Sequence, residues 1–142
     1  MFKNILLPVD LGNEGAQVKA VSTAVEYAKA FGAKIHVMTI VPDFGMSIVG
    51  SFFPPKFEKE ALAEADRRLH AFVKEAIPEG IKVQHVVAHG TIYEEILRFA
   101  EKSGVDMIVM ASHRPEFQDY LLGPNAARVV RHANCSVTVV RD

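Results

Sequence analysis

The chain has 142 residues, with one cysteine, no tryptophan and no excess of charge of either sign. A lone cysteine cannot form an internal disulfide, so the fold does not depend on an oxidising compartment. The 16 basic and 17 acidic residues nearly cancel and form no block of like charge. Nothing in the charge pattern therefore indicates binding to nucleic acid or to an anionic membrane.

Long apolar runs are also missing. No stretch approaches the roughly 20 apolar residues of a membrane helix. The start of the chain does not have the pattern of a signal peptide, because the short apolar run after Asn4 ends at Pro8. We therefore expect a cytoplasmic protein with no membrane partner.

What the chain does contain is enough apolar sequence for one core, at 49% hydrophobic residues. This length and composition predict a single globular domain over residues 1–142. Apolar runs of strand length alternate with segments of helical periodicity and predict the order β-α-β-α-β-α-β-loop-α-β. The expected strands lie at 5–9, 35–41, 81–88, 107–110 and 137–140, and the last helix at about 124–133. The alternation predicts an α/β fold, a doubly wound parallel sheet with helices on both faces.

Two local patterns lead to narrower predictions. Segment 43–55 is rich in proline and glycine, which predicts a loop, yet it is unusually apolar. It either packs over the sheet edge or a partner, or closes over a pocket as a lid. Thr91 and Glu94 have the spacing of a capping box, which predicts that the Thr91 hydroxyl accepts from the Glu94 N–H.

Ligands of such sheets bind beyond the carboxyl ends of the strands, where the winding reverses. The strongest signal there is the run from Ala111 to Pro115, followed by a helix start at Gly123–Pro124. Helix amino termini offer unpaired N–H groups to anions, and Pro124 suits a first helical turn. An anion site and an ordinary strand–loop–helix connection both fit this pattern.

Other kinds of site have less support. Of the six histidines, His85 and His89 share a strand but stand about 13 Å apart, so we expect unrelated histidines and no metal site. Cys135 is interpreted as a small buried apolar residue, with a redox thiol as the alternative. The chain contains no P-loop, no Gly-x-Ser-x-Gly and no His-Glu-x-x-His, so an enzymatic role is not indicated.

Three runs of sequence together resemble the universal stress protein family. They are Ile5–Asp10 at the start, Met110–Pro115, and Asp119–Arg141 with its Leu-Leu-Gly-Pro-Asn core. The resemblance covers the whole chain. The Ser-His-Arg-Pro sequence of the loop after the fourth strand resembles that of one subgroup of the family. It implies a five-stranded Rossmann-like sheet of order 3-2-1-4-5, of the adenine nucleotide alpha hydrolase-like type. It also implies a homodimer that pairs through Val137–Val140, which an exposed edge strand would permit.

The family contains members that bind ATP and members that do not. The binders carry Gly-x-x-Gly, nine residues, then Gly-Ser or Gly-Thr. Here Ala111 and Arg114 replace the two glycines, the spacer before Gly123 is one residue shorter, and Pro124 replaces the hydroxyl residue. These changes limit how closely the backbone approaches a phosphate and remove a donor.

The resemblance nevertheless implies a nucleotide site with a role for each matching position. Asp10 would accept from ribose hydroxyls, and the remaining residues would line the base or surround the phosphates. The implied set is Pro8, Val9, Asp10, Ile40, Met110, Ala111, Ser112, His113, Arg114, Gly123 and Asn125. The implied ligand is ATP, with or without Mg, or another adenine nucleotide.

Three functions follow as hypotheses. The first is a regulatory protein of the stress response that binds an adenine nucleotide and whose state an unknown protein partner reads. The second is a nucleotide-free interaction module of the same fold. The third is a slow ATPase or autokinase, for which Ser47, Ser51 and Ser112 are the candidate phosphate acceptors.

Overall fold

The structure, a computed structural model, describes residues 1–42, 55–112 and 124–141, with the side chains of 55–57 excepted. These residues form five strands, four α-helices and one short 3-10 helix. In chain order they are β1 (Asn4–Pro8), η1 (Glu14–Gln17), α1 (Val18–Phe31), β2 (Lys34–Pro42), α3 (Pro55–Ala76), β3 (Val83–Gly90), α4 (Ile92–Lys102), β4 (Met107–Ser112), α5 (Pro124–His132) and β5 (Ser136–Arg141).

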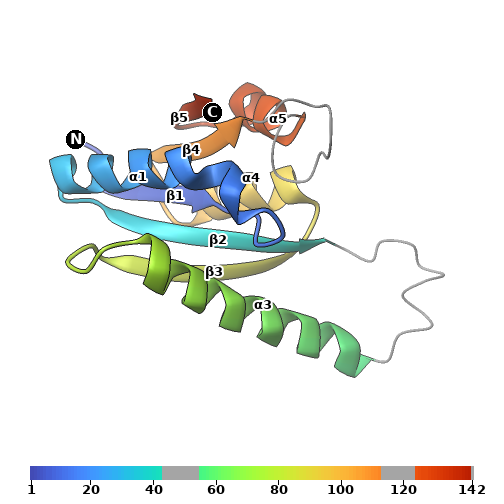
Figure 1. Ribbon diagram of the computed structural model, residues 1–142. Helices are drawn as coiled ribbons and strands as arrows, with labels where there is room; N and C mark the ends of the chain where they lie inside the picture. The colour runs from blue at the N-terminus through green and yellow to red at the C-terminus, as the bar shows by residue number, and fades with distance from the viewer. Residues whose placement is uncertain (43–54, 113–123, 142) are drawn as a thin grey trace.

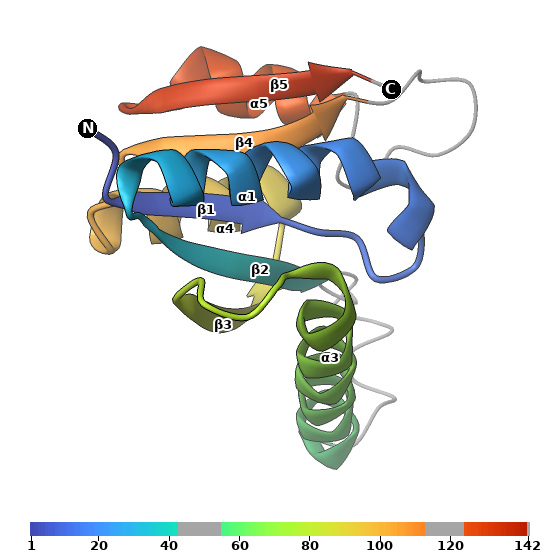
Figure 2. The same ribbon diagram turned by 60° about the vertical axis from the view of Figure 1, so that its left-hand side comes forward.

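The five strands form one parallel sheet of order β3-β2-β1-β4-β5, which confirms the predicted fold class and strand order. Figures 1 and 2 show α1 and α3 on one face of the sheet and α4 and α5 on the other. Because β1 pairs with β2 on one side and β4 on the other, the winding reverses between β1 and β4.

The central strands are continuous apolar runs because helices cover both faces of the sheet at these strands. Ile5, Leu6 and Leu7 of β1 have no exposed surface, and Ile108 of β4 is equally buried. One hydrophobic cluster extends from these strands to the inner sides of the helices. None of the helices in the described ranges is long and apolar enough to span a bilayer.

Helix α1 ends at Phe31, and its C-cap Gly32 takes the left-handed conformation that glycine adopts readily. The predicted capping box at Thr91 is wrong, because the Thr91 side chain makes no capping hydrogen bond. Glu94 accepts a hydrogen bond from the Tyr93 hydroxyl instead of reaching back. The Thr91 backbone carbonyl still accepts from the Glu95 N–H at 3.0 Å, so α4 begins where expected.

Strand β3 runs from Val83 to Gly90, two residues later than expected, because a turn with Gly80 at φ 94° comes first. Most of the strand does not alternate between buried and exposed residues. Six consecutive residues are half-buried, since α3 contacts the strand from one face and α4 from the other. Segment 43–54, with the predicted lid or packing loop, lies outside the described residues, and α3 begins at Pro55.

A row of three hydrogen-bonded polar side chains crosses the sheet near the amino-terminal ends of β1, β2 and β3. His36 of β2 is 4% exposed, and its ring lies 2.5 Å from the Gln84 side-chain oxygen and 3.1 Å from that of Asn4. The ring also packs edge-on against Phe99. Burial lowers the pKa of His36 below 6.5, the hydrogen bond that the Gln84 oxygen accepts from the ring opposes that shift, and Lys34 adds to it.

This lowered pKa predicts a protein that loses stability in acid. The unfolded chain takes up a proton at His36 near pH 6.5, before the folded chain does, so the stability that His36 contributes is present above that pH and lost as pH falls. Urea unfolding at pH 7, 6 and 5 measures the slope, that is, how steeply the free energy of unfolding falls with pH. His36→Gln is expected to flatten it relative to His132→Gln, a matched change at an exposed site. An unchanged slope in His36→Gln contradicts the assignment.

Candidate functional site

The candidate site lies at the carboxyl ends of β1 and β4, on either side of the winding reversal. Leu6 is level with Ile108 in the parallel register, so both strands end at the same edge of the sheet. Asp10 follows β1 by two residues, and Ser112 is the last residue of β4. The tertiary structure therefore brings two of the predicted site residues to one edge from positions about 100 residues apart in sequence.

Asp10 is held in place by a side chain that sequence reasoning missed. Gln17 of η1 is fully buried, and its side-chain oxygen accepts from the Asp10 N–H at 3.1 Å. Its amide nitrogen donates to the Asp10 carbonyl at 2.9 Å. One glutamine thus pairs with both backbone groups of Asp10, as a neighbouring strand would do, and the Asp10 carbonyl also accepts from the Asn13 N–H at 3.1 Å.

One oxygen of the Asp10 carboxylate is hydrogen-bonded to the turn that follows β1. Its Oδ1 accepts from the Gly12 N–H at 2.9 Å. A Cβ added at Gly12 would lie 3.3 Å from this oxygen, so a side chain at that position would crowd the carboxylate. No hydrogen bond or ion pair to Oδ2 occurs among the described residues, and this atom can accept a ligand hydroxyl.

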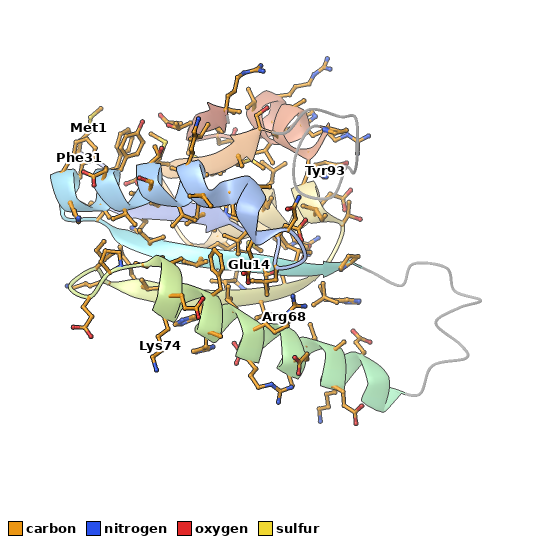
Figure 3. All side chains as sticks on the ribbon, viewed as in Figure 1. Met1, Glu14, Phe31, Arg68, Lys74 and Tyr93 are labelled. Atoms are coloured by element: carbon orange, nitrogen blue, oxygen red, sulfur yellow. The ribbon has the colours of Figure 1, made fainter. Side chains whose placement is uncertain are left out.

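A second support for this turn comes from α3. Arg68 donates through Nη2 to the Leu11 carbonyl at 2.8 Å. Figure 3 shows Arg68 on the sheet side of α3, whereas Lys74 points away from the sheet. The turn after β1 is therefore tied to η1 through Gln17 and to α3 through Arg68. A separation of 57 residues leaves no pattern from which the Arg68 contact could have been predicted.

The apolar members of the predicted site are buried under this edge. Val9 is 2% exposed and donates its N–H to the Met38 carbonyl at 2.8 Å. Met110 and Ala111 of β4 are also buried, whereas Ser112 at the strand end is half-buried. Pro8 and Ile40 complete this group as buried residues of β1 and β2.

The predicted phosphate end is described only in part. Helix α5 begins at Pro124, as expected, and Pro124 is exposed while Asn125 is half-buried in the first turn. The other three predicted residues, His113, Arg114 and Gly123, lie outside the described residues. The described part of the edge therefore offers a carboxylate acceptor, a hydroxyl and a helix start, a set suited to binding a polyhydroxy anion.

The histidines are less scattered in space than in sequence. The rings of His70 (α3) and His85 (β3) stack at 3.7 Å and 9°, which corrects the prediction of unrelated histidines. Burial lowers the pKa of His85, and the neighbouring His70 lowers it further, against the effect of Asp66. His89 contacts Glu58 at 3.2 Å. No group of three or more metal-binding side chains occurs in the ranges that the structure describes.

Cys135 is half-buried at the start of β5. Burial raises the pKa of its thiol, and the nearby Asp106 carboxylate raises it further. A raised pKa suppresses the thiolate, which is the reactive form. This environment favours the packing interpretation of Cys135 over the redox one.

Comparison with known proteins identifies the family. The profile of the Universal stress protein family matches residues 1–141. Universal stress protein G of Escherichia coli O157:H7 is 33% identical over 143 residues, which span 99% of this chain and 100% of that protein. The chain belongs to the universal stress protein family.

Solved structures agree with the observed architecture. Protein MJ0577 of Methanocaldococcus jannaschii has a TM-score of 0.80 at 26% identity, covering 100% of this chain and 97% of that one. A universal stress protein in complex with cAMP has a TM-score of 0.61 at 20% identity, covering 99% and 97%. One from Archaeoglobus fulgidus in complex with dAMP has a TM-score of 0.60 at 20% identity, covering 97% of each chain.

Proposed function

We propose that the protein binds an adenine nucleotide at the carboxyl ends of β1 and β4. The observation that carries this proposal is the position of Asp10, which Gln17 fixes through two hydrogen bonds at the winding reversal. Oδ2 of Asp10 is then available to accept from ribose hydroxyls. The family neighbours in complex with cAMP and dAMP support an adenine nucleotide as the ligand.

In this proposal the polar groups beyond Asp10 hold the phosphates. Ser112 supplies a hydroxyl at the end of β4, and the first turn of α5 supplies Asn125 and the positive end of the helix dipole. Pro124 contributes no N–H, so the phosphate interactions depend on these groups together with His113, Arg114 and Gly123. ATP, with Mg at its phosphates, is the proposed physiological ligand.

The proposed output is regulatory. The bound nucleotide sets a state that a protein partner reads during stress, and the protein acts in the cytoplasm as a homodimer. The proposed dimer contact is the Val137–Val140 segment of β5, which pairs only with β4 among the described strands. Val139 supports this role because its side chain is 38% exposed on that edge.

Calorimetric titration of the nucleotide-stripped protein with Mg-ATP and with AMP tests the binding step. Wild type is expected to bind, and Asp10→Ala to bind at least about tenfold more weakly, because a charged acceptor to the ribose is lost. Asp10→Asn keeps an acceptor oxygen and is expected to fall between the two. Absence of heat and of thermal stabilisation at millimolar nucleotide contradicts the proposal and favours a nucleotide-free interaction module.

A further inference from the structure

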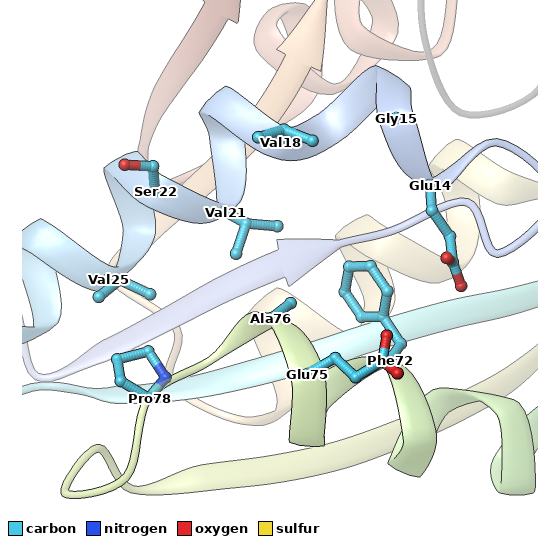
Figure 4. A pocket seen from close by; sticks show the side chains of 10 residues that line it. All are labelled: Glu14, Gly15, Val18, Val21, Ser22, Val25, Phe72, Glu75, Ala76 and Pro78. Atoms are coloured by element: carbon cyan, nitrogen blue, oxygen red, sulfur yellow. The ribbon is translucent and has the colours of Figure 1, made fainter.

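An open groove lies between α1 and α3, and none of the predicted nucleotide-site residues lines it. Its volume is about 520 Å³, and it lies between side chains of η1, α1 and α3 and the turn after α3 (Figure 4). Sites for small organic ligands have volumes of about 300–1,000 Å³. The cavity is therefore large enough for a small molecule.

The two parts of this groove differ in chemistry. Val21 and Val25 of α1 and Pro78 after α3 line one part with apolar side chains. The part shown to the right in Figure 4 contains the ring of Phe72 and the carboxylates of Glu14 and Glu75. A ligand that fills the groove would thus meet an apolar surface along its body and negative charge at one end.

The two carboxylates are not neutralised within the described parts of the chain. No lysine, arginine or histidine lines the groove. The ion pairs found in residues 1–42, 55–112 and 124–141 do not include Glu14 or Glu75. Arg68 of α3 donates to the Leu11 carbonyl and forms no ion pair with either glutamate in the described ranges. Two unpaired carboxylates beside an aromatic ring attract a cation by charge and by the ring quadrupole.

We propose that this groove binds a small organic amine, a cation that carries an apolar body. Its ammonium group is placed between the Glu14 and Glu75 carboxylates and against the Phe72 ring, and its hydrocarbon part contacts Val21, Val25 and Pro78. The same carboxylates repel anions, so the groove disfavours nucleotides, and its lining shares no residue with the proposed nucleotide site.

Three isosteric probes test this proposal by amide NMR titration in the absence of nucleotide. They are phenethylamine, phenethyl alcohol and 3-phenylpropanoate, which differ in the charge of one end. Phenethylamine is expected to give saturable shifts at Val21, Val25 and Ala76. The alcohol is expected to bind at least about fivefold more weakly, because it lacks the charge interactions, and the carboxylate not to bind.

Variants separate the role of charge from that of the apolar wall. Glu14→Gln combined with Glu75→Gln is expected to reduce phenethylamine affinity to that of the alcohol and to leave alcohol binding unchanged. Glu60→Gln is the matched control, an exposed site on α3 about 22 Å along the helix from Glu75. Equal affinity for amine and alcohol in wild type, amine binding unchanged in the double variant, or shifts confined to residues outside the groove would overturn the proposal. These outcomes do not depend on whether ATP binds.

Discussion

Replacing Gln17 by leucine is expected to lower the free energy of unfolding by about 1–4 kcal/mol. Gln17 is fully buried and provides the partners of both the N–H and the carbonyl of Asp10. Leucine fills a similar volume but leaves the part-buried Asp10 N–H without its partner, while the Asp10 carbonyl keeps the Asn13 N–H at 3.1 Å. An unpaired buried N–H costs about 1–3 kcal/mol, and the loss of one of the two bonds to the carbonyl adds about 1 kcal/mol. This change is expected to be among the most damaging single substitutions near the candidate site.

Urea unfolding of three variants measures this effect. At a pH where the glutamate is protonated, Gln17→Glu keeps the acceptor for the Asp10 N–H and offers its O–H to the Asp10 carbonyl, so its loss is expected to lie between those of wild type and Gln17→Leu. Asn13→Ala is the nearby control, because Asn13 makes no side-chain capping bond to η1. If Gln17→Leu unfolds at the same urea concentration as wild type, Gln17 does not hold Asp10 as described.

The second large effect is expected in α3, the helix that carries Arg68 and one wall of the groove. Leu69 has no exposed surface, and it packs where α3 contacts β2 and β3. Leu69→Ala removes a buried side chain and leaves a cavity, which typically costs about 2–5 kcal/mol. Loss of this anchor would also weaken the Arg68 bond to Leu11.

Leu62→Ala is the matched control for this prediction. It makes the same change two turns earlier on α3, where the side chain is only half-buried. Denaturant unfolding of both variants is expected to show a clearly larger loss for Leu69→Ala. Equal losses at the two positions would mean that α3 does not dock through Leu69, and that the wall of the groove is not fixed in the way described.

The fold could be predicted because its signals are local. Buried runs such as Ile5–Val9 and stops such as Gly32 mark the elements, and alternation of strands and helices restricts the topology. The order 3-2-1-4-5 came from the family resemblance, and the structure confirms it. The boundaries of β3 and the capping box at Thr91 were wrong, because neighbouring side chains and turns decided them.

The candidate site could be predicted only where residues follow strand ends. Asp10 and Ser112 were found by that rule, and the structure places both at one edge. Gln17 and Arg68 were missed because a polar side chain in a turn or on a helix normally faces solvent. Their partners are set by the packing of η1 and α3, and no spacing rule relates them to Asp10 or Leu11.

Mapping Mg-ATP onto the assigned amide NMR spectrum tests the central claim most directly. We expect saturable shifts at Val9, Asp10, Ala111, Ser112 and Asn125, with little change at Val21, Val25 and Ala76 in the α1–α3 groove. Shifts confined to that groove, or an unchanged spectrum at millimolar Mg-ATP, would contradict a nucleotide site at the ends of β1 and β4.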